Sequence, residues 1–133
     1  MITRRSLVLI DDDKDDQEIF RAACQSIDET IDVYAFEHGD VALRELNDLR
    51  IRPEVVFVDL NMPRMNGIEV LTAIKNSHAI HEIPVIVYTT YFDEKIKNKC
   101  FDLGAFGIIE KPDTLPQLCA KIESFLQELN MSA

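Results

Sequence analysis

Short apolar runs of strand length alternate with longer amphipathic stretches along this chain of 133 residues. The runs are the segments 7–10, 33–36, 55–58, 84–89 and 107–110. In the stretches that follow them, apolar residues recur every three or four positions, which is the spacing of a helix face. Strands that are apolar without a break are typical of a parallel sheet covered by helices on both faces. We therefore predict an α/β fold, a doubly wound five-stranded parallel sheet built from five βα units.

Apolar residues at helical spacing mark the predicted helices. In the first two helices they are Ile19, Phe20, Ala23, Cys24, Ile27, Ala42, Leu46 and Leu49. Gly104 suits the end of the fourth helix, because glycine readily adopts the left-handed backbone of a C-cap. Asn66-Gly67 is expected to open the third helix. The cysteines Cys24, Cys100 and Cys119 lie inside helical patterns, so we interpret them as small hydrophobes and not as disulfide or metal ligands.

The composition narrows the classes of function. The chain has the length of a common single domain, and 47% apolar residues can furnish its core. We expect one domain over residues 1–133, with its core at about 6–129 and no effector domain. The formal charge of −10 disfavours binding to nucleic acid or to an anionic membrane surface. The apolar run 7–10 is too short for a signal peptide or a membrane span, so we expect a cytoplasmic protein.

Polar side chains follow four of the predicted strands at their carboxyl ends. Asp11 and Asp12 follow the first strand, Asp59 ends the third, Thr89 ends the fourth and Lys111 follows the fifth. In a doubly wound sheet of order 2-1-3-4-5, the first and third strands are neighbours at the topological switch point. The three carboxylates are therefore expected to meet in one crevice.

Three carboxylates in one crevice repel one another unless a cation lies between them. Carboxylates, waters and a phosphoryl oxygen form the all-oxygen set that suits Mg²⁺, which is the cofactor we expect. With the cation bound, Asp59 stays ionised and can attack a phosphorus atom. A lysine ammonium and a threonine hydroxyl can then bind the phosphoryl oxygens, which is most of what phosphoryl transfer requires.

Together, these residues resemble the response-regulator receiver domain, the phosphoacceptor of two-component signalling, in its single-domain form similar to the chemotaxis regulator. The resemblance extends from Leu7 to about Leu126 and implies a flavodoxin-like (βα)5 fold. It rests on four separated motifs in the family's order. They are Val8-Leu9-Ile10-Asp11-Asp12-Asp13, Asp59-Leu60-Asn61-Met62-Pro63-Arg64-Met65-Asn66-Gly67, Thr89 after a strand that begins with proline, and Lys111-Pro112.

The resemblance implies how the crevice handles a phosphoryl group. Asp59 would be phosphorylated from a phosphohistidine donor, and Thr89 and Lys111 would bind the phosphoryl group. The protein would catalyse its own phosphorylation and a slow autodephosphorylation, without being an enzyme acting on a separate substrate. The Lys111–Pro112 bond resembles a position that is cis in the family.

The resemblance also implies a ligand set for Mg²⁺. Asp12, Asp59 and the main-chain carbonyl of Asn61 would ligate the cation directly, and Asp11 would assist largely through water.

Several further aspartates follow these motifs and receive a structural interpretation. Asp13, Asp15 and Asp16 are expected to cap or solvate the start of the first helix, where negative charge meets the positive end of the helix dipole. Asp113 is interpreted in the same way for the last helix.

The chain departs from the family at its signalling switch. The family usually carries Tyr or Phe three residues before its lysine, and this chain has Ile108 there. Phe106 and Tyr91 are the candidates for taking over part of the switching role. This leaves open whether output uses the usual face of the fourth helix, fifth strand and fifth helix. Tyr91 and Asn61 are expected to flank the approach of water to the phosphorus, with the Tyr91 ring slowing hydrolysis.

Three other functions compete with this interpretation. A haloacid-dehalogenase-type phosphatase puts its nucleophile after the first strand with a second Asp two residues on, whereas Asp59 follows the third strand and Asn61 stands at that position. A flavodoxin-like cofactor binder shares the topology, but the four glycines of this chain form no Gly-rich phosphate loop. A receiver relic that only binds partners need not retain every group of the site.

The expected output is binding to another protein, because no effector domain is expected after Leu129. The input partner would be a sensor histidine kinase or a histidine phosphotransfer protein. The chain would then act as a diffusible adaptor that docks on an unknown target protein, or as a relay intermediate that passes its phosphate on. Both versions stay open.

Overall fold

The computed structural model describes residues 5–132, so positions 1–4 and 133 of the expected domain lie outside the described residues. Within that range the chain forms five strands and five helices, which are β1 (Arg5–Ile10), α1 (Lys14–Ile27), β2 (Ile31–Phe36), α2 (Gly39–Asn47), β3 (Val55–Val58), α3 (Gly67–Asn76), β4 (Val85–Thr89), α4 (Glu94–Asp102), β5 (Gly107–Glu110) and α5 (Leu115–Ser132). All neighbouring strands pair in parallel, in the order β2-β1-β3-β4-β5. The predicted doubly wound α/β fold is confirmed.

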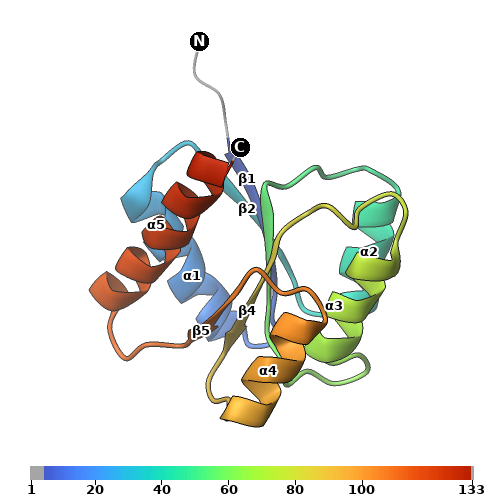
Figure 1. Ribbon diagram of the computed structural model, residues 1–133. Helices are drawn as coiled ribbons and strands as arrows, with labels where there is room; N and C mark the ends of the chain where they lie inside the picture. Colours follow the sequence, from blue (N-terminus) through green and yellow to red (C-terminus); the bar gives the residue numbers. More distant parts are fainter. Residues whose placement is uncertain (1–4, 133) are drawn as a thin grey trace.

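Two apolar clusters, one on each face of the sheet, hold the layers together. α1 and α5 lie on one face and α2, α3 and α4 on the other (Figure 1). Leu9 and Phe57 pack with Phe20 in the first cluster, and Val8 packs with Leu71 in the second. Because successive strand residues face opposite layers, both sets must be apolar, which explains the unbroken runs in the sequence. Among residues 5–132 no helix is long and apolar enough to cross a membrane.

Two apolar residues of the predicted helix patterns are exposed. Ile19 lies in α1, as its spacing predicts, but it is 47% exposed and borders a hollow between α1 and α5. Leu49 is 46% exposed, because α2 ends at Asn47 and Leu49 lies beyond it with a left-handed φ of 58°. An apolar repeat shows which residues share a face, but it does not show where the helix stops.

The cysteines agree with their interpretation as hydrophobes. Cys24 and Cys100 are buried and Cys119 is partly buried, and all three are free thiols. Burial raises the pKa of Cys24 to about 12, so this thiol stays protonated near neutral pH.

The start of α3 fits closely beneath the loop that follows β3. The Asn66 side chain accepts a hydrogen bond from the Glu69 N–H at 2.9 Å, and the Glu69 carboxylate accepts one from the Asn66 N–H at 3.0 Å. This capping box confirms the predicted helix start. A Cβ atom on Gly67 would lie 2.3 Å from the Asp59 carbonyl oxygen, so only glycine permits this approach. The helix start therefore supports the backbone at Asp59 directly.

Candidate functional site

The parallel register brings the polar strand ends together. β1 and β3 are paired up to their last residues, so Asp11 and Asp59, which come next, leave the sheet side by side. The Lys111 N–H donates to the Thr89 carbonyl at 2.7 Å, which extends the pairing of β4 and β5 toward the same edge. Side chains from four strand ends thus meet at the switch point between β1 and β3, where open α/β sheets bind their ligands.

The Lys111 ammonium lies among carboxylates. Its Nζ donates to Asp11 Oδ2 at 2.8 Å, to Asp16 Oδ2 at 2.7 Å and to Asp59 Oδ2 at 3.1 Å. It also lies 5.1 Å from the centre of the Tyr88 ring, within the range of a cation–π interaction. The Lys111 side chain is only 10% exposed. This positive charge offsets the unfavourable burial of the carboxylates around it.

Both oxygens of the Asp59 carboxylate are held by donors. Oδ1 accepts hydrogen bonds from the Thr89 hydroxyl at 3.0 Å and from the Asn61 N–H at 3.3 Å, and Oδ2 accepts from Lys111. Thr89 is fully buried, and Asp59 is also buried. The position and orientation of this carboxylate are therefore set by two side chains and the loop backbone.

Burial and hydrogen bonding shift the proton affinities of two groups. Burial raises the pKa of Asp11 from 3.8 to about 6, against the opposing hydrogen bonds from Lys111 and from the Asp13 N–H. Burial by itself would lower the pKa of Lys111, but the hydrogen bonds to Asp11 and Asp16 outweigh it and hold that pKa above its ordinary value. Lys111 is therefore a permanent cation, whereas ionised Asp11 is held at an energetic disadvantage.

The site offers oxygen ligands to a divalent cation. One carboxylate oxygen from each of Asp11, Asp12 and Asp59 lies within 4.8 Å of the others. Oxygens on opposite sides of a Mg²⁺ ion are about 4.2 Å apart, so oxygens spaced this closely can surround one ion, directly or through water. Asp12 is exposed while the other two are buried, so the cluster opens outward, where waters can complete the coordination. These residues fit a hard divalent cation.

Asn61 and Tyr91 face the same hollow beside the crevice. They line a cavity of about 500 Å³ together with Met62, Ile96 and other residues. Tyr91 is 65% exposed. Asn61 and Tyr91 therefore share one hollow, with Tyr91 on its exposed rim, and their effect on the approach of water stays a prediction.

The candidate switch residues lie in different places. Ile108 is partly buried and packs against the cluster beneath α2, α3 and α4. Phe106 contacts Phe125 of α5 at 6.2 Å between ring centres. Its N–H donates to the carbonyl of Val85, at the opposite end of β4 from Thr89. Phe106 therefore lies at the end of β4 away from Thr89, and its role in switching stays a prediction.

Two expectations for the loop before α5 also differ from the structure. No cis peptide bond occurs among the described residues, so Lys111–Pro112 is trans, the lower-energy isomer for most such bonds. Asp113 does not cap α5. The Thr114 hydroxyl instead accepts from the Gln117 N–H at 3.3 Å, because the helix begins one residue later than an Asp113 cap requires.

Two residues of the site were missed by sequence reasoning. Asp13 caps α1 as predicted, but Asp16, expected only to solvate that helix, forms an ion pair with Lys111. Tyr88 looked like one more apolar residue of β4, and its ring lies beside the Lys111 ammonium. One signal could have found Asp16: the first turn of a helix that follows β1 at the carboxyl edge stands close to the crevice.

Comparisons with known proteins agree with this geometry. The family model of the response regulator receiver domain matches residues 7–123. The transcriptional regulatory protein YdfI of Bacillus subtilis is 34% identical over 101 residues, which are 73% of this chain and 45% of that protein. The chain spans about half or less of the length of the first curated relatives it matches.

Two solved structures of response regulators have the same fold, and one of these proteins is phosphorylated while the other binds Mn²⁺. The phosphorylated cyanobacterial phytochrome response regulator RcpA has a TM-score of 0.85 and 26% identity, with 98% of this chain and 97% of that chain covered. The Mn²⁺-bound form of response regulator Rcp1 has a TM-score of 0.75 and 25% identity, with 90% of each chain covered. With a family model that covers most of its length, this chain belongs to the response regulator receiver domain family.

Proposed function

We propose that this protein accepts a phosphoryl group on Asp59 and signals through its phosphorylated form. Receiver domains take phosphoryl groups from histidine kinases and signal to downstream targets. The observation that carries the proposal for this residue is the way Asp59 is held, with Thr89 on one oxygen and Lys111 on the other. A buried carboxylate fixed next to an ammonium is suited to act as a nucleophile.

In the proposed reaction, an Asp59 oxygen attacks the phosphorus atom of a phosphohistidine. The new P–O bond forms as the P–N bond breaks, and the electron pair of the broken bond goes to the imidazole nitrogen of the donor. The Lys111 ammonium and the Thr89 hydroxyl donate hydrogen bonds to the phosphoryl oxygens. Both donors already lie within hydrogen-bond distance of Asp59, so little reorganisation is needed.

We assign Mg²⁺ as the cation of the site. Asp12, Asp59 and the main-chain carbonyl of Asn61 would hold it directly, and Asp11 through water. When bound, it supplies charge neutralisation at the phosphoryl oxygens. The carboxylate spacing supports this assignment, and so does the Mn²⁺-bound form of the related regulator Rcp1.

Signal transmission in this proposal runs through the loop after β4. Ile108 is stiff at χ1 and has no ring hydroxyl that could exchange partners. Thr89 binds Asp59 directly, and the exposed Tyr91 follows two residues later. We expect a phosphoryl mimic to move the segment 89–92 and the start of α4, while Ile108 keeps one rotamer.

The partners follow from the same chemistry. The donor would be a sensor histidine kinase or a histidine phosphotransfer protein, and the product would bind a target protein or pass its phosphate on.

Phosphorylation by a small donor tests the proposal. Incubation with acetyl phosphate and Mg²⁺ should add one phosphoryl group by intact mass. Asp59→Asn should add none, because the amide cannot form the acyl phosphate. Asp113→Asn, which alters an exposed carboxylate beside the site, is the matched control and should be phosphorylated normally. Modification of the Asp59→Asn protein to the same extent would refute the assignment.

A further inference from the structure

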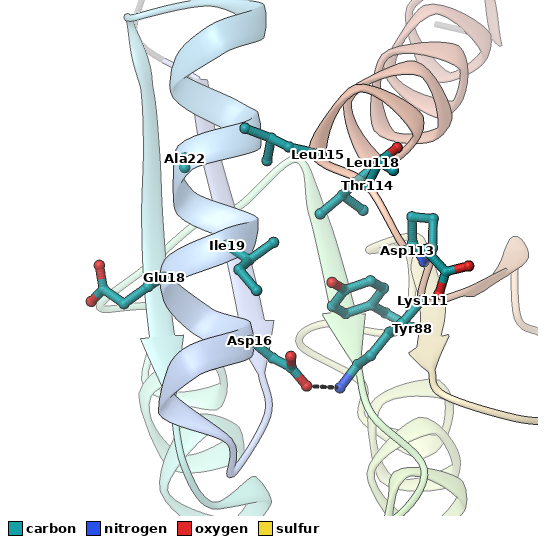
Figure 2. Close-up of a pocket in the computed structure, with 11 residues that line it drawn as sticks. Asp16, Glu18, Ile19, Ala22, Tyr88, Lys111, Asp113, Thr114, Leu115 and Leu118 are labelled. Carbon is teal, nitrogen blue, oxygen red and sulfur yellow. Dashed lines mark hydrogen bonds and ion pairs between the residues drawn. The ribbon is translucent and has the colours of Figure 1, made fainter.

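Asp16 contacts the site from outside the candidate metal cluster. It lies in the first turn of α1, and its Oδ2 accepts from Lys111 Nζ at 2.7 Å. Figure 2 shows Asp16 reaching the ammonium from the α1 side, with the Tyr88 ring close by. Among the described residues, the grouped metal-ligand carboxylates are Asp11, Asp12 and Asp59, without Asp16. Lys111 is thus shared between the cluster and one carboxylate that the cation does not use.

This sharing occupies the whole donor capacity of the lysine. An ammonium has three N–H donors, and Asp11, Asp16 and Asp59 accept one hydrogen bond each. A phosphoryl group on Asp59 needs one of these donors and as much of the positive charge as possible. The Asp16 side chain is 29% exposed and Lys111 is 10% exposed, so water screens this ion pair only in part. The negative charge of Asp16 therefore weakens the attraction of Lys111 for phosphoryl oxygens.

The same ion pair has the opposite effect on a cation. Lys111 and a divalent ion compete for the oxygens of Asp11 and Asp59, because both are positive and both need the same acceptors. Asp16 offers the ammonium an alternative partner on the α1 side, and it adds one negative charge near the cluster. Both contributions favour the cation over the ammonium.

We propose that Asp16 is a positioning residue that sets the balance between the two ligands of the site: through Lys111, it strengthens cation binding and weakens phosphoryl binding. This inference rests on the proposed phosphoacceptor function and adds a regulation of the same site. With this ion pair, the site binds the cation more readily. It also loses its phosphoryl group more readily than a site in which Lys111 had only Asp11 and Asp59 as partners.

Two affinities measured on one pair of variants test the proposal. Asp16→Asn removes the ion pair, and Asp15→Asn removes the same charge from the same helical turn at an exposed side chain. Mg²⁺ affinity is measured by titration calorimetry, and the affinity for beryllofluoride, a phosphoryl mimic, by ¹⁹F NMR at saturating Mg²⁺. In Asp16→Asn we expect Mg²⁺ to bind about threefold more weakly and beryllofluoride about threefold more tightly, as for a partly screened ion pair. Asp15→Asn should leave both affinities near those of the natural protein.

The opposite signs distinguish a positioning role from a structural one. A damaged fold would weaken both ligands, and thermal melting of the two variants checks this, since each loses one carboxylate from the first turn of α1. The inference about Asp16 would be overturned by equal affinities in Asp16→Asn and the natural protein, or by a change of the same sign for both ligands. Neither result would affect the proposed function. The same effect in Asp15→Asn would also overturn it. If the natural protein bound no beryllofluoride and took up no phosphate, the proposed function itself would fail.

Discussion

The two faces of the sheet and the carboxyl ends of its strands contain different kinds of buried groups. Among the described residues, the buried side chains on both faces are apolar, and the buried polar ones are Asp11, Asp59 and Thr89, all at strand ends. The faces gain stability from every group they bury. The strand ends bury charge, which is tolerable only because Lys111 pairs with it. The stability of this molecule and its chemistry are therefore located in separate regions and respond differently to mutation, metal and pH.

A substitution in an apolar layer should have the largest effect on stability. Phe20 contacts Phe57 at 4.8 Å and Tyr88 at 5.4 Å between ring centres. Phe20→Ala should lower the free energy of unfolding by about 3–5 kcal/mol, because it leaves a cavity in a packed layer. Ile19→Ala, one position away at an exposed side chain, is the control and should change it little. Urea denaturation measures both, and similar losses would mean that the layer is not the stabilising region.

Removing the positive charge of Lys111 should have the next largest effect on stability. Lys111→Met leaves buried carboxylates without their cation, and we expect a loss of about 3 kcal/mol in metal-free protein. Mg²⁺ should recover more stability in this variant than in the natural protein, since it replaces the missing charge. Lys121→Met, at an exposed position on α5, should show neither effect. A stable Lys111→Met protein that is indifferent to Mg²⁺ would contradict the proposed balance of charge.

Lowering the pH should stabilise the folded protein through the protonation of Asp11 in the site, and it should leave the apolar layers unaffected. The pKa of Asp11 is about 6 in the folded protein against an ordinary value of 3.8, so the folded state binds the extra proton between these values. The stabilisation from this proton is full below the ordinary value and is lost as pH rises through about 6. In metal-free protein, unfolding curves at about pH 5 and about pH 7 should differ in favour of the lower pH. Asp11→Asn should reduce that difference, and an unchanged difference would show that other groups cause it.

The smallest effect is expected at the rim of the site. Tyr91 is 65% exposed, so Tyr91→Ala should change the free energy of unfolding by less than about 0.5 kcal/mol. If its ring restricts the approach of water, the phosphorylated variant should lose its phosphate several times faster. A tenfold change needs only about 1.4 kcal/mol in the barrier. Tyr34→Ala, an exposed tyrosine on β2, is the control. Decay at the natural rate or slower would mean that Tyr91 does not cover the phosphoryl group.

The sequence by itself predicted the sheet and the meeting of Asp11, Asp12 and Asp59. Both depend on local information. An unbroken apolar run identifies a covered strand, and parallel strands necessarily bring their carboxyl ends to one edge. Thr89 and Lys111 follow by the same rule, because each stands at the end of its own strand.

Only the tertiary structure decided which groups pair within that edge. Asp16 and Lys111 are 95 positions apart, and no periodicity relates a helix start to the end of a distant strand. The position of Ile19 at a hollow and of Phe106 far from Thr89 likewise depends on how α1 and α5 pack and where β5 aligns on β4. Periodicity gives the face of an element on which a side chain lies. The partner of a charged side chain depends on distances of a few ångströms between elements, and packing alone sets these.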